Sequence, residues 1–365
     1  MARRFREEGE LTALPRRLQQ RIRAGGPISV ADYMAEVAAS YYGARDPFGA
    51  AGDFITAPEV SQIFGELLGL WCAELWQRLG APDPVLLVEL GPGRGTLMAD
   101  ALRAARVVPG FDRALRLHLV ETSAALRRKQ AEKLSAFKPH WHDSIATLPP
   151  GPMLLVANEF LDALPIQQFE RRDKSWHERR IGLAEDGESF VFVAAPTPSA
   201  ALQLPEAPAG TIAEIAPAAA ALGVALGTRL AGEGGAALFI DYGHVKSTYG
   251  DTLQALRRHR PVPVLEAPGS ADLTAHVDFA AFAAAARAGG AAVFGPATQR
   301  DFLLRLGRET RKAKLLERAT PDQASAIVSG AARLIEAEQR GSLFKVLALG
   351  QKGAPAPSGF EGETP

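Results

Sequence analysis

The stretch VELGPGRGTLMADAL, residues 88–102, constrains the fold more than any other part of the sequence. An apolar run leads into it, three glycines follow at alternate positions, and a helix-like run comes next. Such a turn lets a ligand approach the backbone and meet the N-terminus of a helix, where N–H groups favour negative charge. The stretch therefore predicts a nucleotide-like ligand between a strand and a helix, although a tight turn without a ligand uses the same glycines.

Short apolar runs alternate with helical ones from residue 85 onward. Runs such as VLLVEL, MLLVANEF and AALFIDYG are typical of buried parallel strands. The alternation predicts a doubly wound α/β sheet, which we place in a core of residues 81–350. Residues 166–215 break this rhythm, because polar and apolar residues alternate there around turn formers, and they predict an antiparallel β insertion.

The first 80 residues predict a helical extension, in which one long helix starts after Pro58. Its loop of residues 45–59 is rich in turn formers and yet carries apolar side chains, so it either tucks under the fold or closes over a ligand. As a lid, the loop would use Phe54 for apolar cover and Thr56 for a polar contact, and it would exclude water from the ligand.

The composition excludes several kinds of partner. Acidic and basic residues balance at 41 each, so no net charge directs the chain to nucleic acid. The single cysteine, Cys72, excludes an intrachain disulfide and a cysteine metal cluster, and its apolar neighbours predict burial. His140, His142 and His177 lack metal-ligand spacing with carboxylate or thiolate partners, so we expect no metal.

Targeting signals are also missing from the pattern. No run of about 18 uncharged apolar residues indicates a membrane span. The N-terminal MARRFREEGE resembles neither a signal peptide nor a transit peptide, so we expect a cytoplasmic protein. The tail of residues 351–365 predicts disorder. The sequence leaves a homodimer open.

Two acidic residues near the glycine turn indicate which ligand it holds. Glu89 precedes the turn, where a carboxylate would repel a pyrophosphate but suits an ammonium group. Glu121 ends the next strand, where an acid can accept both hydroxyls of a ribose. The G-x-G-x-G spacing and the absence of a Lys-Ser/Thr pair exclude a P-loop. The turn residues expected to line the ligand are Gly91, Pro92, Gly93 and Gly95.

S-adenosylmethionine meets all of these requirements. It has an ammonium group for Glu89, a carboxylate for the helix N-terminus, a ribose for Glu121, and no phosphate. NAD is the alternative. Glu121 lies farther along the chain than the roughly 20 residues expected in a dinucleotide fold, although an inserted loop would explain the spacing.

Polar residues also follow the third and fourth predicted strands, at the edge where ligands of open α/β sheets bind. After the third strand, Asp143 could accept a hydrogen bond from an adenine amino group with Ser144 beside it, or either residue could cap a turn. After the fourth strand come Asn158, Glu159 and Asp162, a larger polar group than helix capping requires.

Five segments together resemble the MidA-like family of class I S-adenosylmethionine-dependent methyltransferases. They are GDFITAPEVSQIFGELLG, VELGPGRGTLMADAL, NEFLDALP, IDYG and PGSADLTAHVDF. NEFLDALP and DLTAHVDF are much more specific than the glycine turn, and the resemblance covers about residues 15–350. The family includes the mitochondrial complex I assembly arginine methyltransferase.

The resemblance implies a seven-stranded methyltransferase core with helical and β additions. It also implies dimethylation of an arginine in the quinone-side peripheral-arm subunit of NADH dehydrogenase (complex I) during assembly. Eukaryotic relatives would act in the mitochondrial matrix, whereas a bacterial chain would act in the cytoplasm. The residues themselves support only a methyl-donor site.

An arginine acceptor needs carboxylates that fix its planar guanidinium and localise its charge. We predict Glu159 for this role, with Asp162 as a weaker second because its turn could use it as a cap. Asn158 would place a carbonyl near the methyl group. His276 and Asp278 would complete the pocket from the far side, although Asp278 could instead cap the helix that follows.

Two other functions remain open at this point. A non-catalytic assembly chaperone could hold the same donor for stability, but it would not need the polar group at Asn158, Glu159 and Asp162. A small-molecule methyltransferase would need no open surface for a polypeptide, and the loop of residues 45–59 and the β insertion argue against it.

Overall fold

The computed structural model describes residues 2–44, 56–200, 202, 204–336 and 340–362. The chain forms two compact units. The first comprises Met1–Phe54, Asp162–Ala220 and Lys246–Asp278, and the second comprises Ile55–Leu161, Ala221–Val245 and Phe279–Pro365. This division differs from the predicted one, because the N-terminal helices group with the β insertion instead of forming an extension of their own.

The second unit contains a sheet with the strand order β15-β16-β10-β5-β2-β3-β4. Its strands are β2 (Val85–Leu90), β3 (Leu115–Val120), β4 (His140–His142), β5 (Met153–Asn158), β10 (Gly235–His244), β15 (Ala292–Thr298) and β16 (Phe344–Gly350). Neighbouring strands from β10 to β4 are parallel, and β16 is antiparallel to both of its neighbours. This order confirms the predicted doubly wound, seven-stranded core.

The chain leaves β2 toward β3 and β4 and then returns to β5 on the other side of β2. Open α/β sheets bind ligands at such a reversal, beyond the carboxyl ends of the strands. The fold therefore places the glycine turn after β2 and the polar group after β5 at one edge of the sheet.

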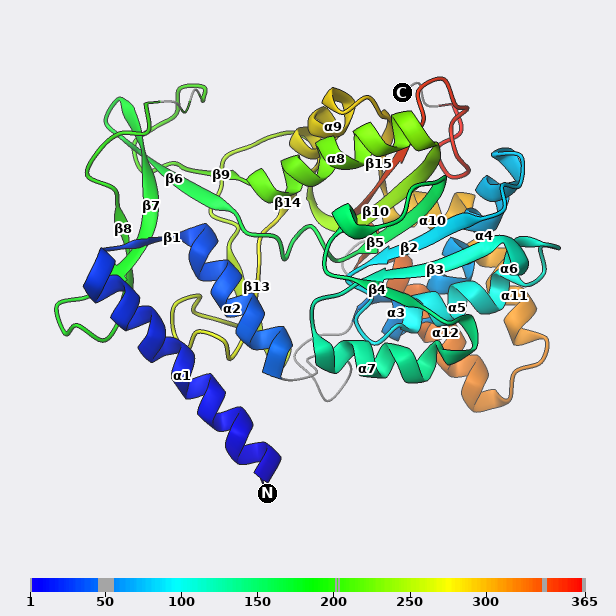
Figure 1. Cartoon of the computed structure of the whole chain (residues 1–365), viewed down its shortest axis with the longest axis horizontal. Coiled ribbons are helices and arrows are strands. Elements are labelled where there is room, and N and C mark those ends of the chain that lie inside the picture. Colours follow the sequence, from blue (N-terminus) through cyan, green and yellow to red (C-terminus); the bar gives the residue numbers. More distant parts are fainter. Residues whose placement is uncertain (1, 45–55, 201, 203, 337–339, 363–365) are drawn as a thin grey trace. The chain divides into compact units, whose positions relative to one another are not determined.

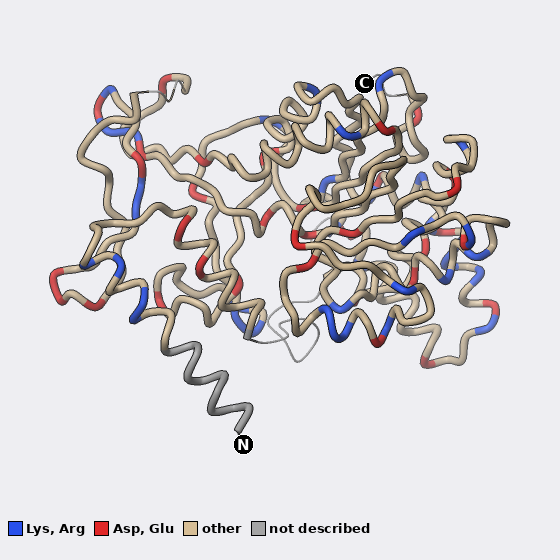
Figure 2. The backbone as a smooth tube through the Cα atoms, viewed as in Figure 1, with Lys and Arg blue, Asp and Glu red and all other residues tan. Residues whose placement is uncertain are grey.

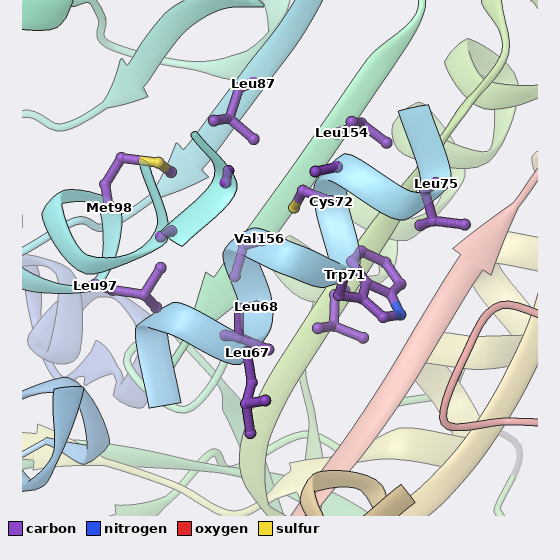
Figure 3. Close-up of a cluster of buried hydrophobic side chains, with 14 of the residues drawn as sticks. Leu67, Leu68, Trp71, Cys72, Leu75, Leu87, Leu97, Met98, Leu154 and Val156 are labelled. Atoms are coloured by element: carbon purple, nitrogen blue, oxygen red, sulfur yellow. The ribbon is translucent and has the colours of Figure 1, made fainter. Parts of the chain in front are cut away.

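Helices cover both faces of this sheet (Figure 1). They are α3 (Ala57–Val60), α4 (Gln62–Arg78), α5 (Thr96–Ala105), α6 (Phe111–Ala114), α7 (Ala124–Lys133), α8 (Pro217–Glu233), α9 (Phe279–Ala288), α10 (Gln299–Arg305), α11 (Arg308–Leu316) and α12 (Pro321–Ile335), with short 3-10 turns at Ser135–Phe137 and Ile145–Thr147. Figure 3 shows Leu68 and Cys72 of α4 in one buried cluster with Leu87 of β2 and Val156 of β5. The predicted burial of Cys72 is confirmed.

The helix predicted to run on from Pro58 is broken. Ser61 has an extended backbone (φ −158°, ψ 130°) and separates α3 from α4. Its side chain accepts a hydrogen bond from the backbone N–H of Ile63, so it caps the start of α4. Serine competes for backbone groups in this way at helix starts, and apolar periodicity alone did not reveal the break.

The tail after β16 is ordered as far as Gly362, so the prediction of disorder is wrong for residues 351–362. The Phe360 side chain is fully buried, and its ring centroid lies 5.4 Å from that of Phe302. The indole N–H of Trp71 donates to the carbonyl of Ser358 at 3.0 Å. The buried Phe360 ring and the hydrogen bond from Trp71 of α4 therefore hold the tail in place, although its composition resembles that of a linker.

The first unit combines two helices with antiparallel β structure. Helices α1 (Ala2–Gly25) and α2 (Val30–Ala44) accompany a sheet of order β1-β7-β6-β9, with β8 paired to β7. Its strands are β1 (Ile28–Ser29), β6 (Gln167–Arg172), β7 (Ser175–Leu183), β8 (Phe190–Ala194) and β9 (Ile212–Ile215). The predicted antiparallel insertion is confirmed.

A second, smaller sheet in this unit was not predicted. It has the order β12-β11-β13 and is formed by β11 (Gln254–Arg257), β12 (Arg260–Val262) and β13 (Asp272–Thr274), and the two-residue strand β14 (Val277–Asp278) follows it in the chain. Helix α9 begins at Phe279, directly after β14.

Charged residues of both signs are interspersed along the backbone of each unit (Figure 2), in line with the balanced composition. Among the described residues, no helix is both long and apolar enough to span a membrane.

The buried tail gives the first testable expectation. Phe360→Ala should lower the free energy of unfolding by about 3–5 kcal/mol, because it leaves a cavity against Phe302. Leu343→Ala, at an exposed position, is the control and should change it by less than about 0.5 kcal/mol. Urea denaturation measures both values, and equal stability of the two variants would show that the tail does not anchor the fold.

Candidate functional site

The glycine turn connects β2 to α5 through three left-handed residues. The φ angles are 60° at Gly91, 52° at Gly93 and 74° at Gly95, a region in which side chains are strained. The turn is closed by a hydrogen bond of 2.7 Å from the N–H of Gly95 to the carbonyl of Pro92. Gly95 is the N-cap of α5, so no side chain at that position covers the first N–H groups of the helix.

Glu89, the second-last residue of β2 before this turn, is the most unusual group of the site. Its side chain is only 3% exposed, and Oε2 has no hydrogen-bond partner among the described residues. Burial raises the pKa of the Glu89 carboxyl to about 8, and the charge of Glu121 adds to the effect. A buried carboxylate without a partner is costly, so the position favours a ligand that brings a cation or a donor.

Gln130, on α7, ties the turn to the acidic residue of the next strand. It is fully buried, and its Nε2 donates to the carbonyl of Gly93 at 2.7 Å and to Oε2 of Glu121 at 3.2 Å. Its Oε1 accepts from the indole N–H of Trp141 at 2.9 Å. Both polar atoms of the Gln130 side chain are therefore engaged, and they link the glycine turn to Glu121 and Trp141.

Sequence reasoning missed Gln130, although a signal was present. It lies four residues after Leu126 and four before Leu134, both of which are buried, so it occupies the apolar stripe of an otherwise charged helix. A polar residue in such a stripe must find buried partners.

Glu121 lies at the end of β3, as predicted, and is buried. Its Oε1 accepts from the backbone N–H of Ser123 at 2.8 Å. Burial raises the pKa of Glu121, and the hydrogen bonds from Ser123 and Gln130 act in the opposite direction. The carboxylate is thus held in one orientation, as a receptor for ribose hydroxyls requires.

The two residues predicted near an adenine lie close to this cluster. Asp143 forms an ion pair of 2.6 Å with Arg127, whose Nε donates to the carbonyl of Glu121 at 2.6 Å. The carbonyl of Ser144 accepts from the hydroxyl of Thr147 at 3.0 Å, which is a turn-capping role. An adenine contact for either residue stays a prediction.

The end of the predicted lid connects to the glycine turn. Glu59 of α3 accepts a hydrogen bond of 2.6 Å from Thr96, the first residue of α5, and Lys133 donates to the same threonine at 2.6 Å. Thr56 is buried at the N-cap of α3, whereas Phe54 and the rest of residues 45–55 lie outside the described residues. A lid function stays a prediction.

Glu159 directly follows β5 and has a left-handed backbone (φ 52°), which is uncommon for a residue with a side chain. Its Oε1 accepts from three donors: the N–H of Ala57 at 3.1 Å, Nδ2 of Asn158 at 3.1 Å, and Nη1 of Arg340 at 2.9 Å. Strained backbone of this kind concentrates at functional sites.

Asn158 presents an acceptor that the protein does not use. Its Oδ1 is buried and has no partner among the described residues. The NH₂ group of the amide faces the Glu159 carboxylate, whose oxygens act as acceptors, so Oδ1 points away from that contact. A ligand with an N–H group would complete this position.

The remaining predicted residues lie in the first unit. Asp162 is buried and its carbonyl accepts from the N–H of Ala275 at 3.0 Å. The N–H of His276 donates to the hydroxyl of Thr252 at 2.9 Å, and Asp278 is half-buried at the end of β14. Their part in a substrate pocket stays a prediction. No cluster of metal-ligating side chains occurs in the described part of the chain.

Comparison with known proteins identifies the family. Residues 67–297 match a family model described as putative S-adenosyl-L-methionine-dependent methyltransferases. The chain belongs to this family.

Relatives and solved structures agree with this assignment. The chain is 37% identical to "Protein arginine methyltransferase NDUFAF7, mitochondrial" of Danio rerio, with 91% of this chain and 85% of the relative covered. It is 36% identical to the human protein of that name, with 94% and 84% covered. A likely methyl transferase from Burkholderia thailandensis, solved with S-adenosyl-homocysteine bound, superposes with a TM-score of 0.84 at 28% identity, covering 98% of this chain and 97% of that one.

The methyl donor of the family, S-adenosylmethionine, fits the residues present. The unpartnered Oε2 of Glu89 suits its ammonium group, and the uncapped N-terminus of α5 suits its carboxylate. Glu121, held by Ser123 and Gln130, suits its ribose. The donor predicted from the glycine turn is thereby supported by an unsatisfied buried atom and not only by a motif.

The raised pKa of Glu89 makes the stability of the donor-free protein depend on pH. An acid whose pKa rises from 4.5 to about 8 on folding contributes full stability below pH 4.5, and that stability is lost as the pH rises toward 8. Glu89→Gln should therefore match the wild type at pH 4.5 and be more stable at pH 8, by a few kcal/mol (order of magnitude). It should also bind the donor at least ~10-fold more weakly. Urea unfolding at both pH values and calorimetric titration check this, and equal pH dependence of the two proteins would contradict it.

The glycine turn has its own test. Gly93→Val places a branched side chain at a left-handed position that the donor must approach, so donor affinity should fall at least ~10-fold, about 1.4 kcal/mol. Unfolding curves confirm that the variant is folded, and calorimetry measures the affinity. A folded variant with wild-type affinity would place the donor elsewhere.

Proposed function

We propose that this methyltransferase acts on an arginine side chain of a protein. The observation that carries the proposal is Glu159, a carboxylate at the carboxyl end of β5, which sits beside an unused amide oxygen on Asn158. The names of relatives at 36–37% identity, which call them protein arginine methyltransferases, point to the same acceptor.

The chemistry explains why a carboxylate is needed. A guanidinium stays protonated at all ordinary pH values, so its nitrogens are poor nucleophiles. When bound, S-adenosylmethionine supplies an electrophilic methyl group carried on a sulfonium sulfur. Glu159 would hold the planar guanidinium and draw its positive charge away from the nitrogen that attacks.

The proton must also be accounted for. Methyl transfer forms a nitrogen–carbon bond, breaks the carbon–sulfur bond, and requires the attacking nitrogen to lose one proton. Oδ1 of Asn158 can accept a hydrogen bond from that nitrogen, and the Glu159 carboxylate can take up the proton before solvent removes it. Asp162, His276 and Asp278 are proposed as further substrate contacts.

For the protein substrate, we propose the quinone-side peripheral-arm subunit of complex I. The support is the resemblance of the NEFLDALP and DLTAHVDF segments to the MidA-like family. The curated relatives are named as mitochondrial, and we propose the cytoplasm as the corresponding compartment for a bacterial chain.

The catalytic expectation concerns Glu159→Gln. The amide is nearly isosteric but uncharged, so methylation should fall by about 10²-fold or more while donor affinity changes only a few-fold. Single-turnover methylation and calorimetry measure the two quantities. Near wild-type methylation would move the catalytic carboxylate elsewhere, with Asp278 as the first position to examine. Loss of donor binding would assign Glu159 to the donor site.

The substrate class is tested in cells. Mass spectrometry of complex I subunits from a deletion strain should reveal one arginine that has lost its methyl groups, and these should return with the wild-type gene but not with Glu159→Gln. An unchanged arginine methylation pattern would remove the proposed substrate.

A further inference from the structure

The carboxylate assigned to the substrate guanidinium already binds one from the same chain. Nη1 of Arg340 lies 2.9 Å from Oε1 of Glu159, and the two side chains are 16% and 13% exposed. Arg340 lies between α12 and β16, far from Glu159 in the sequence. The pair is therefore a tertiary contact made at the carboxyl end of β5.

A second group at this position also recognises guanidinium. The Cζ atom of Arg340 lies 4.7 Å from the ring centroid of Phe344. Phe344 is buried at the start of β16, and its ring packs edge-on against Tyr242 with centroids 5.5 Å apart. A carboxylate together with a fixed aromatic face matches both the charge and the flat surface of a guanidinium.

The other hydrogen bonds of Glu159 are made with neighbouring groups of the protein that hold its position. The backbone N–H of Ala57 and the amide of Asn158 bond the same oxygen as Arg340, and the N–H of Glu159 donates to the carbonyl of Ile240 at 2.9 Å. These three bonds fix where the carboxylate points. Arg340 contributes the cation, and another guanidinium could supply the same charge and donors.

We propose that Glu159 and the ring of Phe344 form the subsite for the methyl-accepting guanidinium, and that Arg340 fills this subsite until the substrate arrives. This inference rests on the proposed arginine acceptor. One guanidinium replaces another when the substrate binds, so the half-buried carboxylate of Glu159 is never left without a cation. A lysine ammonium lacks the flat fork, so it matches the carboxylate and the ring of Phe344 less well than a guanidinium does.

Competition by Arg340 has a measurable consequence. A site that is open only part of the time binds its ligand more weakly by that fraction. Arg340→Met removes the guanidinium but keeps an unbranched side chain, so the affinity for a short peptide with one central arginine should rise about 3- to 10-fold. Binding is measured by calorimetry with S-adenosylhomocysteine present, and a matched lysine peptide should gain nothing.

Arg229→Met is the matched control. The Arg229 side chain is 13% exposed, close to the 16% of Arg340, and it also pairs with a carboxylate, Glu233 at 3.1 Å. Unlike Arg340, it donates to the carbonyl of Leu148, which lies before the start of β5. This variant should leave peptide affinity unchanged. Phe344→Leu in the Arg340→Met background should remove most of the gain, because the aromatic face is lost.

The possible outcomes separate this inference from the proposed function. If the wild type methylates arginine but Arg340→Met binds the peptide no better, the inference is wrong and the function stands. The same holds if Arg340→Met keeps its KM and loses kcat, since Arg340 would then position Glu159 instead of competing with the substrate. If neither protein methylates or binds arginine, both ideas are overturned.

Discussion

The buried carboxyl group of Glu89 is the constraint on which the site depends. It lies inside a sheet strand, it has one oxygen without a partner in the described protein, and burial raises its pKa to about 8. A chain selected only for stability would place an apolar residue at this position. A ligand that brings positive charge to the carboxyl edge of the sheet would complete this carboxyl group, and the helix N-terminus after the turn that follows would suit a carboxylate on the same ligand.

The proposed donor and acceptor parts of the site share structural supports. Helix α3 is only four residues long, yet Glu59 bonds Thr96 at the start of α5 and the N–H of Ala57 bonds Glu159. A shift of this helix would therefore alter both parts at once. Gln130 plays a similar role within the donor part, since one side chain holds the glycine turn and Glu121. Such outer contacts keep reacting groups in place.

The sequence predicted the features that depend on local pattern. The doubly wound core follows from alternating apolar runs, and the positions of Glu89, Glu121 and Glu159 follow from strand ends. It did not predict contacts between distant segments. The burial of Phe360 depends on α4 and α10, and the pairing of Glu159 with Arg340 joins β5 to a segment beyond α12. No periodicity within either segment carries that information.

The most direct test of this account measures protons at the donor site. Titration of the wild type with S-adenosylmethionine at pH 7, in buffers of different ionisation enthalpy, gives the number of protons exchanged on binding. Because the ammonium group of the donor should ionise Glu89, we expect release of roughly one proton, and none from Glu89→Gln. Binding without proton release by the wild type, or equal release by the variant, would contradict the assignment of Glu89 to the methyl donor.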